Sequence, residues 1–339
     1  MERDMESKTP SIIDLDAELA KLTMFRRAPQ STRAETKGSV ARLASYRDGL
    51  LLAIKSSGTD HWERHLTGDE LVHILDGAET LEIVCDDGPP KSFEIRAGMI
   101  VVIPQGAWHR SYSSEGTTAM TATPFPGEHV ELDVDDPRTV EHKPARAIEE
   151  DMGGARLPSI IDLDGELAKL TMFRGRTPQS TMADRKGSGG RLAPYRDGAL
   201  FTTKFAGKGH WESHLTGDEL IRILDGTATL EIVGEDGPQS FALRAGMIAV
   251  IPQGAWHRFH SSEGVTLMTA TPSPSKVSSS MSTTRGRLSA SRHEHTTWST
   301  SRPPRRDDAR RVARGLSPGR GSLSLVGTRR GIVHREFLE

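Results

Sequence analysis

The sequence predicts an all-β protein in which one barrel-shaped domain occurs twice. Two observations support this fold class. The stretch SIIDLDAELAKLTMF (11–25) returns as SIIDLDGELAKLTMF (159–173), and HLTGDELVHILDG and GMIVVIPQGAWHR also return almost unchanged. Between these stretches, short apolar runs alternate with Gly, Asp and Pro, which is typical of short strands joined by turns. A repeat of this length is a copied domain rather than a solenoid unit.

Each copy begins with a segment of helical spacing. In IDLDAELAKL (13–22), an Asp stands at the start, where it caps a helix. The runs that follow, among them GLLLAIKSS, ELVHILDG, GMIVVIPQG and TTAMTATP, have the length of strands. DDGPP and EDGPQ are typical hairpin turns. A β domain of this size must close its sheet edges, and a jelly roll, or double-stranded β-helix, does so.

The repeat sets the expected domain boundaries. We expect a flexible N-terminus at 1–9, a first barrel at 10–125, a linker at 126–157, a second barrel at 158–274 and a disordered tail at 275–339. The linker is rich in Asp, Glu, Pro and Arg. The tail is rich in Ser, Thr, Arg and Pro, and such a composition cannot bury enough apolar surface to fold alone.

The genetic code offers a further explanation of the tail. The first copy continues as VELDVDDPR (130–138), whereas the second has SSSMSTTRG (278–286) in that place. Codons for SSSMSTTRG, read from the last base of the Val277 codon, encode VELDVDDPR. We therefore infer a one-nucleotide frameshift just after Pro272, which puts the residues from about 275 onward out of frame. A basic arm for nucleic acid is the competing interpretation.

The nucleotide sequence of the gene tests this inference. The expected codons at Ser278, Ser279 and Ser280 are TCG, AGC and TCG, because only these restore VELDVDDPR in the neighbouring frame. Other serine codons at these positions contradict the frameshift.

Composition excludes several classes of partner. The formal net charge is −2, so no general positive field attracts nucleic acid. No apolar run approaches the about 20 residues of a membrane span. The N-terminal MERDMESKTP has no secretory signal, and the single cysteine excludes an intrachain disulfide. We expect a cytoplasmic protein that binds neither nucleic acid nor membrane.

Two stretches of each copy hold histidines and glutamates at fixed spacing. The first is ERH(x4)E(x6)G in copy one and ESH(x4)E(x6)G in copy two, and the second is G(x5)PQG(x2)H. Residues two apart on a strand face the same side, so Glu63 and His65 point together, and a barrel brings His109 to them from a distant strand. His61 and His210 share this phase and are alternative ligands.

These stretches resemble the two signature motifs of the cupin superfamily, G(X)5HXH(X)3-4E(X)6G and G(X)5PXG(X)2H(X)3N. The resemblance covers both repeats. It departs at Glu63 and Glu212, where family members usually have His, and at Ser113 and Ser261, where they have Asn. The resemblance implies two metal sites, one formed by Glu63, His65, Glu70 and His109, the other by Glu212, His214, Glu219 and His257.

Two imidazoles with one or two carboxylates suit a divalent transition metal, namely Fe, Mn, Ni, Co or Zn. The resemblance implies a metal-dependent enzyme of dioxygenase or isomerase type that acts on a small organic molecule, with the second Glu as a base. The alternatives are a non-catalytic barrel that binds a small ligand or metal, as sensor and storage cupins do, and a near-inert duplicate.

Oligomeric state follows from the same resemblance. Single cupin domains often dimerise, so the two copies are expected to pack as an internal pseudo-dimer. Dimerisation of the whole chain stays open.

Overall fold

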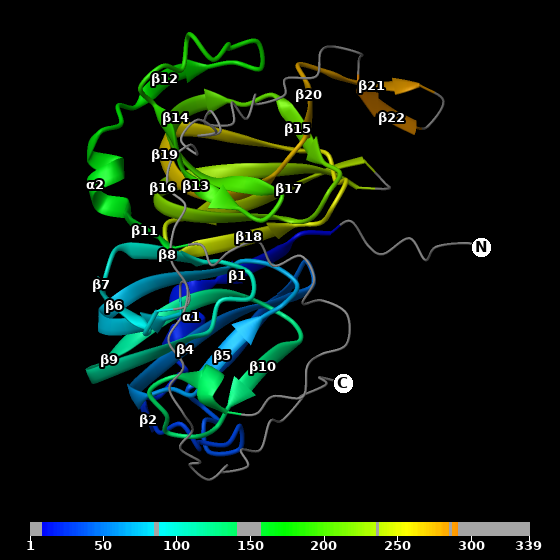
Figure 1. Cartoon of the computed structure of the whole chain (residues 1–339). Coiled ribbons are helices and arrows are strands. Elements are labelled where there is room, and N and C mark those ends of the chain that lie inside the picture. Colours follow the sequence, from blue (N-terminus) through cyan, green and yellow to red (C-terminus); the bar gives the residue numbers. More distant parts are fainter. Residues whose placement is uncertain (1–8, 85–87, 141–156, 235–236, 285–286, 291–339) are drawn as a thin grey trace, which may run out of the picture.

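The computed structural model describes residues 9–84, 88–140, 157–234, 237–284 and 287–290. Within them the two copies form two β barrels that lie one above the other (Figure 1). Nearly all of the predicted flexible N-terminus, and residues 291–339 of the predicted tail, lie outside the described residues.

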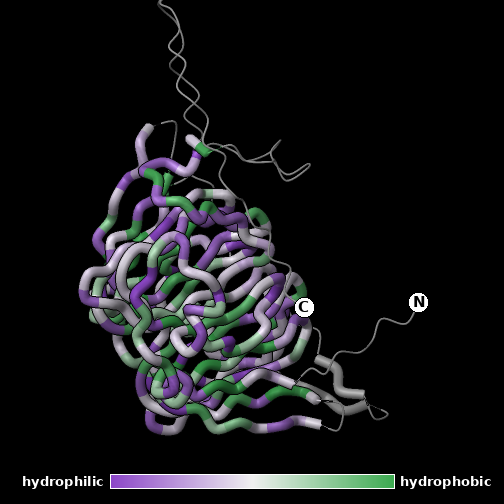
Figure 2. Tube along the Cα trace, turned by 90° about the horizontal axis from the view of Figure 1, so that it is seen from below, coloured by the Kyte–Doolittle hydropathy of each residue, from purple (hydrophilic) through white to green (hydrophobic). Residues whose placement is uncertain are grey.

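The first barrel is built around three long strands. β9 (His109–Pro124) lies between β4 (Gly49–Thr59) and β6 (Glu70–Ile83) and is antiparallel to both. Shorter strands complete the barrel: β2 (Phe25–Arg27), β3 (Val40–Tyr46), β5 (Trp62–His65), β7 (Lys91–Arg96), β8 (Met99–Ile103) and β10 (Gly127–Val130). Apolar and polar residues follow one another along the strands (Figure 2), as expected where one side of a strand faces the core.

The second barrel repeats this arrangement strand for strand. Its strands are β12 (Phe173–Arg176), β13 (Gly189–Tyr195), β14 (Gly198–Lys208), β15 (Trp211–His214), β16 (Glu219–Gly234), β17 (Gly237–Arg244), β18 (Met247–Ile251), β19 (His257–Pro272) and β20 (Ser275–Ser278). The register repeats as well, since Glu63 pairs with His109 and Glu212 pairs with His257. The predicted fold class, two β barrels in tandem, is confirmed.

Each copy begins with a strand, and the helix follows it. β1 (Ser11–Asp14) precedes α1 (Leu15–Leu19), and β11 (Ser159–Asp162) precedes α2 (Leu163–Ala168). The helix predicted over 13–22 is therefore shorter, because Ile13 and Asp14 pair in a sheet. The Asp14 carboxylate accepts a hydrogen bond from the backbone N–H of Ala17 at 3.2 Å and caps α1. Neither helix has the length or apolar content to cross a membrane.

The N-terminal strands are exchanged between the barrels. β1 of the first copy pairs with β18 of the second, and β11 of the second copy pairs with β8 of the first. The two registers are equivalent, with Ser11 opposite Val250 and Ser159 opposite Val102. Each sheet thus contains a strand from the other copy, and the copies pack as the internal pseudo-dimer that the sequence predicts (Figure 1).

One apolar core spans the junction of the barrels. It unites side chains from β1, α1, β11 and α2 with the faces of both barrels that point away from the barrel interiors, since Leu51 and Leu71 alternate with the cavity-lining Leu52 and Val72. Leu15 and Leu163 are 1% and 2% exposed, and Tyr46 and Tyr195 are equally buried. Because both copies share this core, each barrel buries this outer apolar face against the other, while its interior holds an apolar cluster of its own.

Reciprocal hydrogen bonds close the rim of this junction. Arg47 and Arg196 have φ values of 54° and 50°, in the left-handed region that residues with a Cβ rarely adopt. The backbone N–H of Arg47 donates to the Asp218 carboxylate at 2.8 Å, and that of Arg196 donates to Asp69 at 2.8 Å. These bonds across the junction stabilise the unfavourable backbone conformation.

Two expected boundaries differ from the structure. Residues 127–130 of the predicted linker form β10, which pairs with β5, and a short 3-10 helix (Pro137–Thr139) follows. Residues 275–278 of the predicted tail form β20, which pairs with β15 as β10 does with β5, and β21 (Met281–Thr284) pairs with β22 (Arg287–Ala290). Such segments are held by backbone hydrogen bonds to a strand edge, so no apolar pattern marks them.

Truncating a leucine of the shared core should destabilise the protein, whichever copy the leucine comes from. Leu15→Ala and Leu163→Ala are each expected to lower the free energy of unfolding by about 2–5 kcal/mol, because a buried leucine leaves a cavity. Leu15→Met is the volume-conserving control, expected to cost under about 1.5 kcal/mol. Urea unfolding followed by tryptophan fluorescence measures all three. A Leu15→Ala cost equal to that of the control contradicts a shared core.

Candidate metal centre

Four side chains converge inside the first barrel. Glu63 and His65 lie two residues apart on β5, Glu70 opens β6 and His109 opens β9. Cross-strand pairing places Glu63 opposite His109. Their ligand atoms lie within 4.8 Å of one another, although the residues come from three separate strands. The structure therefore brings together all four residues predicted for this site.

The distances suit four ligands around one ion. His109 Nε2 lies 3.0 Å, and His65 Nε2 3.4 Å, from Glu70 Oε2. Glu63 Oε1 lies 3.7 Å from His109 Nε2, and Glu63 Oε2 lies 3.9 Å from His65 Nε2. Ligands about 2.1 Å from a common ion are separated by roughly 3–4 Å.

Unpaired buried atoms show that this group fits a metal. Nε2 of His65, His109, His214 and His257 and Oε2 of Glu219 have no hydrogen-bond partner among the described residues. The imidazole and carboxylate atoms are close, but their N–H directions do not meet the oxygens. A buried unsatisfied polar atom costs about 1–3 kcal/mol. A cation at the centre of each group satisfies these atoms together, so the residues present fit a divalent metal.

The second barrel holds a smaller group. His257 Nε2 and His214 Nε2 lie 2.9 and 3.2 Å from Glu219 Oε2, and these three residues form the cluster. Glu212 stands 3.9 Å from His257 and lies outside that cluster. The assignment of Glu212 as a ligand therefore stays a prediction.

Neighbouring groups orient the ligands in both barrels. His109 Nδ1 lies 3.0 Å from the carbonyl oxygen of Ala107, which directs Nε2 to the centre. The Thr123 hydroxyl donates to Glu70 Oε1 at 2.6 Å. The second barrel has the same contacts, through Ala255 and Thr271.

The glycine that ends the first motif has a steric role. Gly77 and Gly226 have φ values of 79° and 76°. A Cβ on either would stand 2.1 Å from the carbonyl oxygen of Gly116 or Gly264. Only glycine permits this close approach, which lets β6 and β16 continue across β9 and β19.

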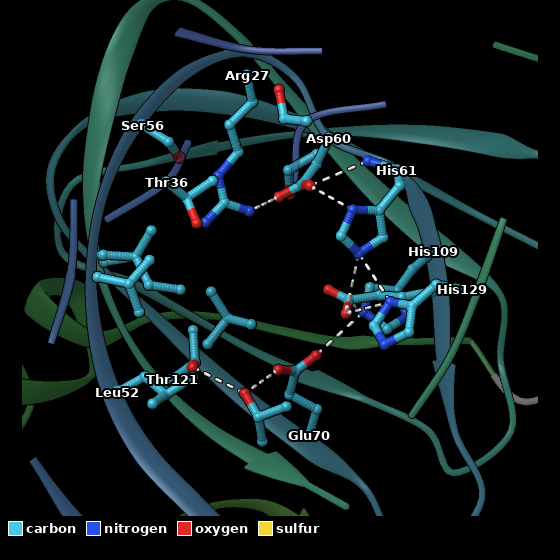
Figure 3. Close-up of a pocket in the computed structure, with 18 of the residues that line it drawn as sticks. Arg27, Thr36, Leu52, Ser56, Asp60, His61, Glu70, His109, Thr121 and His129 are labelled. Carbon is cyan, nitrogen blue, oxygen red and sulfur yellow. Dashed lines mark hydrogen bonds and ion pairs between the residues drawn. The ribbon is translucent and has the colours of Figure 1, made fainter. Parts of the chain in front are cut away.

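The four-residue group of the first barrel opens into a cavity of about 770 Å³. Its walls combine apolar side chains such as Leu52, Val72 and Leu81 with a few charged ones (Figure 3). A cavity of this size and lining suits a small organic molecule.

Sequence analysis missed three residues at this cavity: Arg27, Asp60 and His129. Figure 3 shows Arg27, Asp60 and His61 in a row that leads to His129. Arg27 forms an ion pair with Asp60, and Asp60 Oδ1 lies 3.2 Å from His61 Nδ1. His129 lies in the predicted linker, where no motif marks it. The Asp60-to-Gly209 difference between the repeats was the only visible signal.

Charge pairs inside the group perturb its pKa values. Burial disfavours the charged carboxylates, but adjacent imidazoles lower the pKa of Glu70 to about 2, and that of Glu219 likewise to about 2. Burial also disfavours charged imidazoles, but Glu70 raises the pKa of His109 to about 9, and Glu219 raises that of His214 to about 9. Without a metal, these groups hold one another charged.

Comparison with known proteins identifies part of the chain. Residues 200–270 match the family model described as a cupin domain. No curated protein matches the sequence significantly. Among solved structures, the Mn(II)-containing oxalate decarboxylase of Bacillus subtilis is 12% identical with a TM-score of 0.43, covering 70% of this chain and 74% of that one. A deletion mutant of that enzyme is 13% identical with a TM-score of 0.43, covering 68% and 71%. Likeness at this level says nothing about the reaction of this chain.

The ion pairs predict how the metal-free protein responds to pH. The carboxylates have a lowered pKa in the folded state, so the stability they contribute is present above pH 4.5 and is lost as the pH falls toward 2. The imidazoles have a raised pKa in the folded state, so the stability they contribute is present below pH 6.5 and is lost as the pH rises toward 9. Stability after chelation should therefore peak between these limits.

Urea unfolding at a series of pH values measures this profile. The Glu70→Gln/Glu219→Gln double variant is the control, and both limbs of its profile should flatten. A stability of the metal-free wild type that rises from pH 6.5 to 9 contradicts the assignment.

Proposed function

We propose that this chain, which belongs to the cupin superfamily and holds two of its domains in tandem, binds a divalent transition metal in each domain and acts as an enzyme on a small organic molecule. Fe, Mn, Ni, Co and Zn all suit the ligands. Dioxygenase and isomerase reactions are the classes we favour.

The observation that carries the proposal is the set of unpaired buried ligand atoms beside a cavity. The Nε2 atoms of His65 and His109 are buried, lie beside the same carboxylate oxygen and have no hydrogen-bond partner among the described residues. In a site that served only packing, nothing would offset the free-energy cost of removing these nitrogens from water. Because the cavity begins at the same point, a molecule inside it reaches the site.

When bound, the metal supplies a Lewis acid or a site for O₂ at its open positions. The cavity walls bind and orient the substrate and exclude water. His65, His109 and Glu70 hold the ion, as do His214, His257 and Glu219 in the second domain.

Glu63 is the residue of the first domain best placed to move a proton. Its side chain is 26% exposed and faces the cavity. Burial raises its pKa, but His61 and other imidazoles hold that pKa well below its ordinary value. Glu63 is therefore held as a carboxylate, the form that a proton acceptor or a metal ligand needs. Glu212 has the same place in the second domain.

A barrel that binds a ligand without turning it over is the alternative. Turnover that is lost on chelation supports the enzyme, and ligand binding without turnover supports the alternative.

Metal content tests the proposal before any substrate is known. His65→Ala and His214→Ala should each remove about one ion per chain, because each deletes a ligand from one domain. The double variant should lose both. Elemental mass spectrometry of the purified full chain, reconstituted with Mn, Fe, Ni or Zn, measures this. His260→Ala, at an exposed position, is the control. Unchanged metal content in the double variant contradicts the proposal.

A further inference from the structure

A second group of ligand-type side chains lies beside the first one in domain 1. His61 precedes β5, Glu63 lies on β5, and His129 lies on β10 directly opposite Glu63. All three line the cavity, and their ligand atoms lie within 4.8 Å of one another. Figure 3 shows His61 and His129 facing each other beside His109.

The distances within this group suit an ion. His61 Nε2 lies 2.8 Å from His129 Nδ1, and these atoms lie 3.7 and 3.6 Å from Glu63 Oε2. Ligands about 2.1 Å from one ion give such separations when the angles between them are about 85–120°. These angles lie within the range that transition metals accept.

The ring of His61 is already oriented as a ligand. Its Nδ1 lies 3.2 Å from Asp60 Oδ1, and Arg27 forms an ion pair with Asp60. A histidine that donates one ring N–H to a carboxylate presents the lone pair of its other nitrogen, as metal-binding histidines do. In the tautomer that carries its proton on Nδ1, the lone pair of His61 Nε2 faces His129 and Glu63.

Glu63 belongs to both groups. Its Oε1 lies 3.7 Å from His109 of the first group, and its Oε2 lies 3.6 Å from His129 of the second group and 3.9 Å from His65 of the first. A carboxylate that stands between two ligand groups is placed to bridge two ions, and two-metal sites place their ions about 3.5–4 Å apart. The usual His of the cupin motif has no second ligand atom on this side, whereas Glu63 does.

Among the described residues of the second domain, this group has no counterpart. Val277 lies opposite Glu212, where His129 lies opposite Glu63. Gly209 occupies the position of Asp60. The backbone N–H of Asp60 donates to the carbonyl oxygen of Ser111, and that of Gly209 donates to the equivalent carbonyl oxygen, that of Phe259. His210 keeps only Glu212, at 3.6 Å, as a neighbouring ligand. Two of the required residues are thus missing at equivalent positions.

We propose that domain 1 holds two divalent metal ions bridged by Glu63, whereas domain 2 holds one. This inference rests on the proposed metal site of each domain, and it makes Glu63 a metal ligand in place of a proton acceptor. The competing structure is a plain hydrogen bond between the imidazoles of His61 and His129.

The sharpest variant is His129→Val, which installs the residue that domain 2 has at this position. Full-chain protein is loaded with Mn(II), and bound metal is counted by elemental mass spectrometry after removal of free ion. Three ions per chain are expected for the wild type and two for His129→Val. His61→Ala is a second variant with the same expectation, and His210→Ala, its counterpart in domain 2, should keep three.

Electron paramagnetic resonance gives an independent readout. The wild type should show an exchange-coupled Mn(II) pair, and His129→Val should show isolated Mn(II) alone. Two ions per chain in both proteins, with no coupled signal, overturn the inference. If His65→Ala and His214→Ala still remove ions in that case, the proposed function stands. Absence of bound metal in every protein overturns both.

Discussion

The exchange of the N-terminal strands is the constraint on which the rest of the structure depends. β8 and β18 open the second motif and lead through the PQG turns to His109 and His257. Each of them pairs on one side with its own barrel and on the other with a strand of the partner domain. Leu15 and Leu163 then enter a core common to both barrels. The position of each metal-ligand histidine is therefore braced by the other half of the chain.

Within each barrel, strand register rather than charge attraction assembles the ligands. Glu63 and His109 are cross-strand partners, so the pairing of β5 with β9 places them side by side whatever their charge. Desolvation opposes the charges on Glu70 and His109, and only their proximity offsets it. The fold thus holds these ligand atoms close together although their mutual attraction stabilises the protein little. A bound cation would stabilise the same arrangement much more.

Much of this arrangement was accessible from the sequence, and the exceptions have physical causes. The resemblance to the cupin motifs identified His65, Glu70 and His109, and strand phase agreed with it by placing Glu63 and His65 on one side. The strand state of Ile13 was missed, since its pairing partner lies more than two hundred residues away and leaves no local signal. His129 was missed because β10 is short and polar, and only the edge of β5 makes it a strand. Hydrophobic patterns in a sequence indicate which side chains are buried, whereas these two segments are strands because of backbone pairing with distant partners.

The shared core has a consequence for how the two halves change over time. In a dimer of identical chains, every mutation appears in both subunits, so the two pockets remain copies. Here the same architecture is encoded as one continuous chain, and each pocket is inherited separately. Asp60 with Gly209, and His129 with Val277, are differences that a symmetric assembly cannot express. Because the two domains are encoded in one chain, they can diverge in sequence. One domain can keep the residues that maintain the fold while the residues of the other site change.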